Sequence, residues 1–286
     1  MNTTISLKLF SFGIQKLHDP NWTGMDLYDK IKQHVRQRTE PKNLLFKTLK
    51  DGLLYYLGNW IYEEYLIHLE GNEEYIELEG DYLLWYLEDY LAFLIDSGVD
   101  ENDDLIKVSF EELENFNNLF VEDESKYYEL LFEKSEALKT SIINLSIQYE
   151  LQIESMKSIY SQDFAERVFH DRTLCEYISE LLITIGFDGT ISEDDLPQKW
   201  INRYNIPSWA KKAIISRDRG KCAQCDKNLV IELESNYHFD HIVPLHYGGT
   251  NDLSNLQLLC EKCNLEKSTS KVSVKTSVPK YLQIKK

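Results

Sequence analysis

The stretch HFDHIVPLHYGGTNDLSNLQLLCEKCN, at residues 238–264, decides the fold of the C-terminal part of the chain. It ends in the cysteine pair CEKC, and 34 residues separate this pair from an earlier one, CAQC at 222–225. Two CxxC pairs are typical of a tetrahedral structural zinc site, with an iron site as the less favoured alternative. Metal binding would add folding free energy to a module that has little core of its own. The predicted zinc ligands are Cys222, Cys225, Cys260 and Cys263.

The order of residues in this stretch resembles the HNH endonuclease family. The matching features are Asp-His-Ile-x-Pro at 240–244, a GlyGly turn at 248–249, Asn-Leu at 255–256, and Asn264 directly after the last cysteine. The resemblance covers roughly residues 209–267. It implies a ββα-metal fold, in which a β-hairpin packs on a helix, and hydrolysis of phosphodiester bonds in DNA.

The same resemblance implies a role for four residues. His241 is the expected general base, since a neutral imidazole can take a proton from water at pH 7. Asp240 and Asn264 are expected to bind one catalytic divalent cation, Mg²⁺ or Mn²⁺, which would neutralise charge on the phosphate. Asn255 is expected to hold the loop and to orient the imidazole ring.

Several further residues are candidates for contact with DNA. Lys267 resembles the CNxxK ending of the family, and Arg217, Arg219 and Lys221 precede the first cysteine pair. A merely solvated basic turn explains the last three equally well. His238 either contacts phosphate or packs beside its neighbours on one face of the strand.

Charge divides the chain into two parts of opposite sign. The 286 residues contain 31 Lys and Arg against 48 Asp and Glu, a formal net charge of −17. Residues 201–286 alone carry a net charge of +6, which leaves −23 on residues 1–200. Such asymmetry predicts a segment that faces nucleic acid, attached to a part that repels it.

We expect a mainly α N-terminal domain followed by a small α+β HNH domain that holds the four-cysteine zinc site. The sequence GFDGTISEDDLP at 186–197 has the composition of a linker or turn. The predicted regions are therefore an acidic, mostly helical regulatory or partner-binding domain at 1–190, the nuclease domain at 198–270, and a basic tail at 271–286. The tail is interpreted as an arm that tracks DNA or as a disordered end.

Apolar residues at three- and four-residue spacings predict helices within 41–97, 125–160 and 163–185. SLKLFSF, at 6–12, instead alternates like a strand. Residues 51–106 contain 16 Asp and Glu but no Lys or Arg. They form either the solvated face of packed helices or a surface that binds a basic partner or covers the basic nuclease-like module until a signal displaces it. A regulatory subunit or a second copy of the chain is the possible partner of the acidic domain.

No apolar stretch reaches 18 residues, and the N-terminus lacks the pattern of a secretion signal. Together with the metal-type cysteine spacing, this predicts a soluble cytoplasmic protein with no membrane partner. Cys175 is the fifth cysteine, and its apolar surroundings in the sequence favour a buried structural thiol.

The leading hypothesis is a metal-dependent DNA endonuclease. By analogy with other HNH proteins, it would be a regulated bacterial restriction or anti-phage defence effector. The alternative is a catalytically inactive zinc-containing protein that binds nucleic acid or acts as a scaffold to recruit a partner. A secreted nuclease toxin is the least favoured hypothesis.

Overall fold

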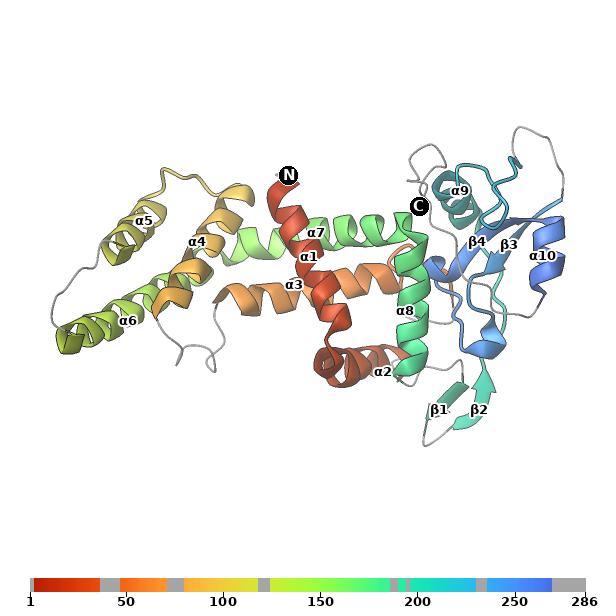
Figure 1. The fold of residues 1–286 in the computed structure, drawn as a ribbon, viewed down its shortest axis with the longest axis horizontal. Coiled ribbons are helices and arrows are strands. Elements are labelled where there is room, and N and C mark those ends of the chain that lie inside the picture. Colours follow the sequence, from red (N-terminus) through yellow and green to blue (C-terminus); the bar gives the residue numbers. More distant parts are fainter. Residues whose placement is uncertain are drawn as a thin grey trace. The chain divides into compact units, whose positions relative to one another are not determined.

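The structure is a computed structural model, and it describes residues 3–36, 47–70, 80–117, 124–185, 190–193, 196–229 and 236–268. Within these ranges most residues are helical, and two separate antiparallel two-stranded sheets are present (Figure 1). The helices of the N-terminal two thirds are α1 (Thr3–His18), η1 (Trp22–Leu27), α2 (Tyr28–Arg36), α3 (Leu53–Glu70), α4 (Gly80–Asp96), α5 (Asp104–Asn117), α6 (Glu124–Gln148), α7 (Glu150–His170) and α8 (Arg172–Thr184).

The C-terminal third mixes strands and helices. In chain order its elements are β1 (Thr190–Glu193), β2 (Leu196–Trp200), α9 (Ser208–Arg217), β3 (Tyr237–His241), η2 (Leu245–Tyr247), η3 (Leu253–Asn255), β4 (Leu256–Cys260) and α10 (Glu261–Lys267). This arrangement confirms the expected fold class, a mainly helical N-terminal part with a small α+β part at the C-terminal end. None of the helices in the described ranges combines the length and apolarity that a membrane crossing requires.

Contacts between residues divide the chain into two compact units. Unit 1 comprises Met1–Ile14 and Gly58–Asp163, and unit 2 comprises Gln15–Leu57 and Phe164–Lys286. The unit that contains the cysteine pairs thus extends well beyond the domain predicted at 198–270, because segments from the N-terminal part fold with it.

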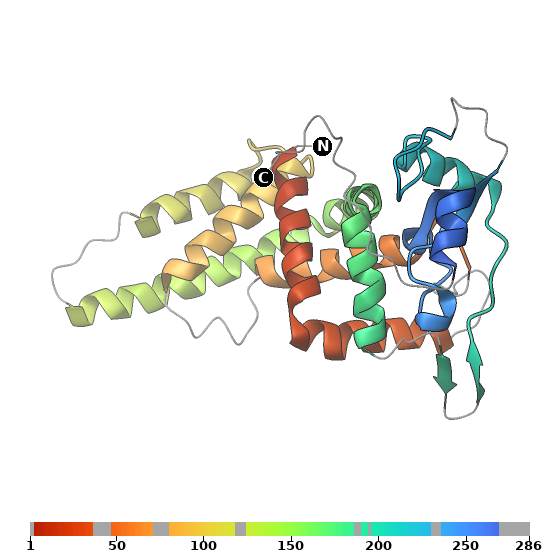
Figure 2. The same ribbon diagram turned by 45° about the vertical axis from the view of Figure 1, so that its right-hand side comes forward.

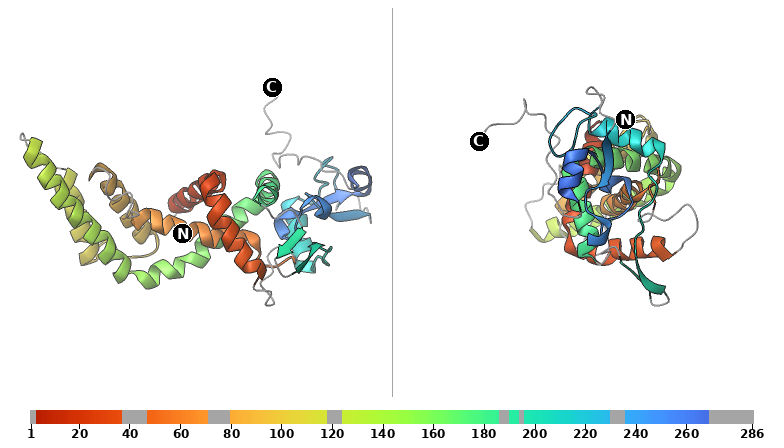
Figure 3. Two further views of the ribbon diagram at one scale, coloured as in Figure 1. Left: turned by 90° about the horizontal axis from the view of Figure 1, so that it is seen from below. Right: turned by 90° about the vertical axis from the view of Figure 1, so that its right-hand side faces the viewer.

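Unit 1 is built around aromatic side chains of α3, α4 and α7. The ring of Tyr62 stacks on that of Tyr160 with centroids 5.6 Å apart, and Phe93 lies 6.2 Å from the first ring and 6.0 Å from the second. The Tyr62 hydroxyl donates a 2.6 Å hydrogen bond to the carbonyl of Ile153. Helices α4, α5 and α6 pack against one another in the same unit (Figure 3).

Two expectations about helices need correction. The strand predicted at 6–12 is wrong, since these residues lie in α1, where the buried positions Ser6, Leu9 and Gly13 follow helical spacing. Burial of that face outweighs the local alternation of SLKLFSF. The helical stretch predicted at 125–160 is interrupted at Tyr149, which separates α6 from α7.

The chemistry-bearing part of unit 2 is a hairpin with a helix attached. Strand β3 pairs with β4 in a register that places Tyr237 opposite Cys260 and His241 opposite Leu256. Helix α10 follows β4 without a loop and packs on both strands (Figure 2). Its first turn is capped by Cys260, whose Sγ accepts a 3.4 Å hydrogen bond from the Cys263 amide. This is the ββα arrangement that the resemblance implied.

Helix α8 supports the hairpin from within unit 2. Asp171 caps its N-terminus by accepting hydrogen bonds from the amides of Thr173 and Leu174, at 2.8 and 3.2 Å. One face of the helix contacts η3, and Cys175 packs in a small buried cluster with Ile242 and Val243. The loop between β3 and β4 therefore rests on a helix from the preceding part of the chain.

The segment predicted as a linker at 186–197 contains regular structure. Strand β1 pairs antiparallel with β2, with Thr190 opposite Trp200 and a register shift after Ile191. The predicted basic tail at 271–286 lies outside the described residues.

Candidate active site and metal centre

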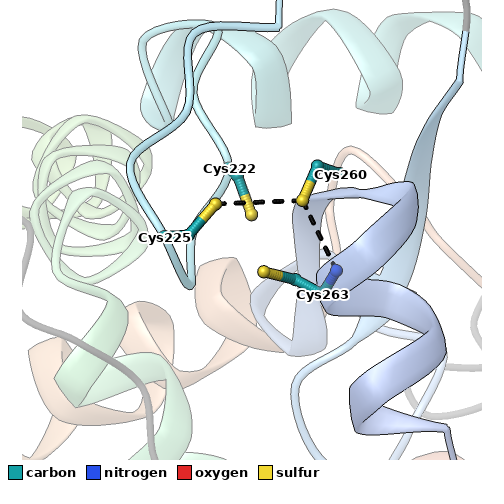
Figure 4. Close-up of side chains that lie close together, drawn as sticks. All are labelled: Cys222, Cys225, Cys260 and Cys263. Atoms are coloured by element: carbon teal, nitrogen blue, oxygen red, sulfur yellow. Dashed lines mark hydrogen bonds between the residues drawn. The ribbon is translucent and has the colours of Figure 1, made fainter.

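The two cysteine pairs meet in a single cluster. The Sγ atoms of the four cysteines all lie within 4.8 Å of one another, and the clustered residues are Cys222, Cys225, Cys260 and Cys263 (Figure 4). The first pair is carried by the turn after α9, and the second spans the junction of β4 and α10. All but Cys225 are buried.

The geometry of the cluster fits a zinc ion. Zn–S bonds of about 2.3 Å in a tetrahedron give sulfur–sulfur separations of about 3.8 Å. The Sγ atoms of Cys225 and Cys260 are 3.8 Å apart. Burial, followed by the neighbouring sulfurs of Cys260 and Cys225, raises the pKa of the Cys263 thiol well above its ordinary value. A bound divalent cation would favour the thiolates in this crowded set, so the four residues form a structural metal site suited to zinc.

Strand β3 directs Asp240 and His241 toward different neighbours, as alternation along a strand requires. Asp240 is 8% exposed, and its Oδ2 lies 2.8 Å from Nζ of Lys267 and 3.5 Å from Nε2 of Gln257, the cross-strand partner. His241 is 3% exposed, and its Nε2 lies 3.1 Å from Oδ1 of Asn251. The two side chains are thus fixed by separate sets of contacts.

The contacts of Asn251 determine which nitrogen of His241 carries the proton. Asn251 Nδ2 donates to the carbonyl of Asn202 at 2.7 Å, and Oδ1 accepts from the amide of Tyr204 at 3.3 Å, which orients the amide group. An amide oxygen can only accept, so Nε2 of His241 must be the donor. In a neutral ring the lone pair is then on Nδ1, the nitrogen available to accept a proton.

The surroundings of His241 keep the ring neutral. The pKa of His241 is lowered to about 4, and burial is the main cause. The positive charges of Arg203 and Lys267 contribute to this lowering, whereas the Asn251 hydrogen bond and the charge of Asp240 oppose it. The imidazole is therefore unprotonated at pH 7 and chemically competent as a base.

Asn255 is completely buried and holds the loop between β3 and β4. Its Nδ2 donates to the carbonyls of Val243 and Thr250, both at 2.9 Å, and its Oδ1 accepts from the Val243 amide at 2.8 Å. The hydrogen bond of the His241 ring is instead accepted by Oδ1 of Asn251. The structure thus separates two tasks that the resemblance assigned to Asn255, fixing the loop and orienting the ring.

Sequence motifs alone do not point to Asn251. It follows the GlyGly turn in a mostly polar run, TNDLSN, whose composition is typical of a loop. The signal that identifies it is its burial, 2% exposed, which is uncommon for an asparagine in a turn and requires compensating hydrogen bonds.

Lys267 reaches back from α10 to the hairpin. Its Nζ pairs with Asp240 and donates to the carbonyl of His241 at 2.7 Å, and the residue is 5% exposed. The ammonium group thus places a positive charge directly on the carboxylate expected to bind the catalytic cation. Asn264 is half-buried on the same helix, and its carbonyl accepts from the Ser268 amide at 3.0 Å.

A catalytic cation is compatible with this donor set. A carboxylate such as that of Asp240 and an amide oxygen such as that of Asn264 are hard oxygen ligands of the kind that Mg²⁺ and Mn²⁺ prefer. Oδ2 of Asp240 is paired with the Lys267 ammonium at 2.8 Å, so a divalent cation would bind beside this ion pair or replace it.

The predicted DNA contacts fall into two groups. Arg217 is 5% exposed, pairs with Asp218 at 2.8 Å and donates to the carbonyl of Leu256 at 2.6 Å, with its guanidinium 4.9 Å from the Phe169 ring. This burial is incompatible with a surface contact to DNA, so Arg217 is better explained as a packing residue. The same holds for Lys267, which is equally buried and pairs with Asp240. Arg219, Lys221 and His238 are exposed, as a contact to DNA requires.

Comparison with known proteins agrees with the geometry. No curated protein and no solved structure matches the chain, and no family model matches the N-terminal part. Residues 222–270, which contain both cysteine pairs, β3, β4 and α10, match the family model described as HNH endonuclease, so the C-terminal region of this chain is similar to HNH endonuclease domains.

Proposed function

We propose that the protein is a metal-dependent endonuclease that hydrolyses phosphodiester bonds in DNA. The observation that carries the proposal is the buried His241, whose ring is held by Asn251 and which directly follows Asp240 on β3, in a region that matches the HNH endonuclease model. A base that is neutral at pH 7 and a carboxylate that can hold a cation are the two groups that this hydrolysis requires.

In the proposed mechanism, Nδ1 of His241 accepts a proton from the attacking water, while Asn251 keeps the ring in the required tautomer. Asp240 and Asn264 would hold the divalent cation, which supplies charge neutralisation at the phosphate when bound. Lys267 positions Asp240 and, through the carbonyl of His241, the end of β3. Asn255 positions the loop that follows.

The test is cleavage of supercoiled plasmid in Mg²⁺ or Mn²⁺ by the full-length protein and by His241→Ala. Loss of a general base is expected to lower the rate by about 10²- to 10⁴-fold, with zinc content unchanged. Because His241 is buried, thermal unfolding is followed in parallel and the rates are compared at a temperature at which both proteins are folded. His246→Ala is the matched control, since His246 is exposed in η2 and packs on Tyr247. Undiminished cutting by His241→Ala would refute the mechanism. If the parent is also inactive in every metal while zinc is bound, the alternative of an inactive binding or scaffold protein replaces the nuclease.

We further propose that the protein acts in the cytoplasm as a regulated restriction or anti-phage defence effector. The cytoplasmic location is supported by the metal-type spacing of the cysteines, which suits a reducing compartment. The defence role rests on analogy with other HNH proteins, and the acidic N-terminal part is the proposed site for a regulatory subunit or a second copy.

The defence role is tested by counting phage plaques on bacteria that express the parent chain or His241→Ala. The parent is expected to give fewer plaques, and equal numbers over a broad panel of phages would contradict the defence role.

A further inference from the structure

An open cavity of about 480 Å³ lies beside the catalytic strand within unit 2. One wall comes from β3 and the other from the segment that leads into α9. The lining residues are Arg203, Tyr204, Asn205, Ile206, Lys211, Tyr237, His238 and Phe239. Its volume falls in the usual range for small organic ligands.

The cavity combines partly exposed aromatic rings with positive charge. Tyr204 is 39% exposed and Tyr237 is 38% exposed, so part of each ring is accessible to a partner. Nζ of Lys47 lies 5.9 Å from the centre of the Tyr204 ring and adds a further cation beside it. Tyr237 also meets Phe239 edge to face, with centroids 5.8 Å apart, which holds the two rings in a fixed arrangement. Exposed aromatic rings of this kind are platforms on which nucleobases stack.

The charges of the lining residues favour an anionic ligand. Arg203 and Lys211 contribute two cations, and Lys211 Nζ lies 5.8 Å from the centre of the Phe239 ring. None of the eight lining residues, all within the described ranges, has a carboxylate. A basic groove interleaved with aromatic rings is the chemistry that binds the phosphates and bases of an unpaired strand together.

The cavity is also tied to the proposed general base. Phe239 on its wall is two residues before His241 on β3, so both side chains belong to the same face of the strand. The opposite wall is joined to the same imidazole through Asn251, which binds the carbonyl of Asn202 and the amide of Tyr204. A nucleotide in the cavity would therefore lie next to the phosphate presented to His241.

We propose that this cavity binds an unpaired nucleotide of the DNA substrate, with its base against Tyr204 and Tyr237 and its phosphate near Arg203 and Lys211. The inference rests on the proposed nuclease function and adds a substrate class to it. Such nucleotides occur in single-stranded DNA or at a duplex position where a base has left the stack. In either case the fully paired duplex is the poorer ligand.

The experiment measures binding of the full-length His241→Ala protein to three fluorescent oligonucleotides, without added divalent cation so that cleavage is absent. These are a single strand, a duplex with one unpaired base, and the fully paired duplex. Tyr204→Leu and Tyr237→Leu are each expected to weaken binding of the single strand by roughly 5- to 150-fold, the range expected for one lost stacking contact. A preference for the bulged duplex over the single strand would identify an extruded base as the source of the ligand, and the reverse preference would identify single-stranded DNA.

Two controls separate stacking and charge from general surface effects. Tyr247→Leu removes an exposed tyrosine of the same unit outside the cavity and is expected to leave binding unchanged. Lys211→Gln is expected to reduce the slope of log K against log salt by about 0.7, the value for one phosphate contact on a single strand. Lys212→Gln, the exposed neighbour that does not line the cavity, should leave that slope unchanged.

The outcomes distinguish this inference from the proposed function. If the parent cuts plasmid but both tyrosine variants bind the single strand as His241→Ala alone does, the cavity proposal is overturned and the nuclease stands. Equal losses on all three oligonucleotides would also overturn it, since the effect would then not depend on an unpaired base. If the parent never cuts DNA but the tyrosine variants still lose single-strand binding, the cavity is supported and the nuclease proposal fails.

Discussion

At the scale of single residues, Asn251 is the buried side chain that links the His241 ring to the surrounding backbone. Asn251→Ala deletes the acceptor at Nε2 of His241 and releases the backbone of Asn202 and Tyr204. We expect the rate of plasmid cleavage to fall by about 10- to 100-fold, as for other residues that orient a functional histidine.

Asn251→Asp provides the informative comparison. Asp keeps the oxygen that accepts from His241 but loses the amide donor to Asn202, so it should recover part of the rate that Asn251→Ala loses. Its added negative charge would stabilise the imidazolium and move the acidic limb of the pH–rate profile upward. If the two variants have the same rate and the same pH profile, Asn251 supports the fold without orienting the ring.

Cys175 offers a prediction about pH and stability. Burial raises the pKa of this thiol to about 12. Between pH 9 and about 12 the unfolded chain loses the thiol proton while the folded chain keeps it, so this group lowers the stability as pH rises through that window and has no such effect below it. From pH 8 to pH 10 the free energy of unfolding of the parent should fall by about 1 kcal/mol more than that of Cys175→Ala. If urea titrations showed that the free energy of unfolding falls equally with pH in the parent and in Cys175→Ala, the burial of this thiol would be contradicted.

At the scale of elements, the loop between β3 and β4 depends on the close approach of its second glycine to the strand end. A Cβ on Gly249 would lie 1.9 Å from the Val243 carbonyl oxygen and 2.8 Å from Nδ2 of Asn255. Gly249→Ala should therefore shift this loop and cost about 1–3 kcal/mol in the free energy of unfolding. Gly24→Ala is the matched control, because nothing lies within 4 Å of its added carbon. Equal urea midpoints for the two variants would show that the loop adapts without strain.

The elements also show how far the sequence could predict the structure. The spacing of the cysteine pairs predicts the zinc site, and the resemblance to the HNH family implies the ββα hairpin, because both depend on residues close to one another in the motif. The partners of the loop could not be predicted in this way. Thr48 donates to the carbonyl of Asn251, the Leu53 amide to Asp252, and the Ser179 hydroxyl to Oδ1 of Asn255 at 3.4 Å, yet all three are distant in sequence and carry no motif. Likewise, nothing in the basic turn before the first cysteine distinguishes the buried Arg217 from the exposed Arg219, since only tertiary packing decides which of them reaches the surface.

At the scale of the whole molecule, the HNH domain depends on earlier parts of the chain for support. Within unit 2, Thr48 Oγ1 donates to the carbonyl of Asn251 at 2.8 Å, and the amide of Leu53 donates to Asp252 Oδ2 at 3.0 Å. From α8, Arg172 donates to the carbonyl of Ala223 at 3.1 Å. A nuclease domain that began at residue 198 would leave these buried groups without partners, and each such loss costs about 1–3 kcal/mol.

We therefore expect a fragment of residues 198–270 to bind zinc but to unfold at a lower temperature than the full chain and to cut DNA more slowly.

The full-length chain tests the same dependence at a single contact. Thr48→Val removes the donor to Asn251 and should destabilise unit 2 by about 1–3 kcal/mol and slow cleavage, since Asn251 in turn holds His241. Thr184→Val is the control, because that exposed hydroxyl bonds to the carbonyl of Glu180 one turn earlier in its own helix.

The fragment has two informative outcomes. If the fragment were as stable and as active as the full chain, the N-terminal segments of unit 2 would be dispensable and the domain boundary predicted near residue 198 would hold. A destabilised but still active fragment would restrict their role to stability.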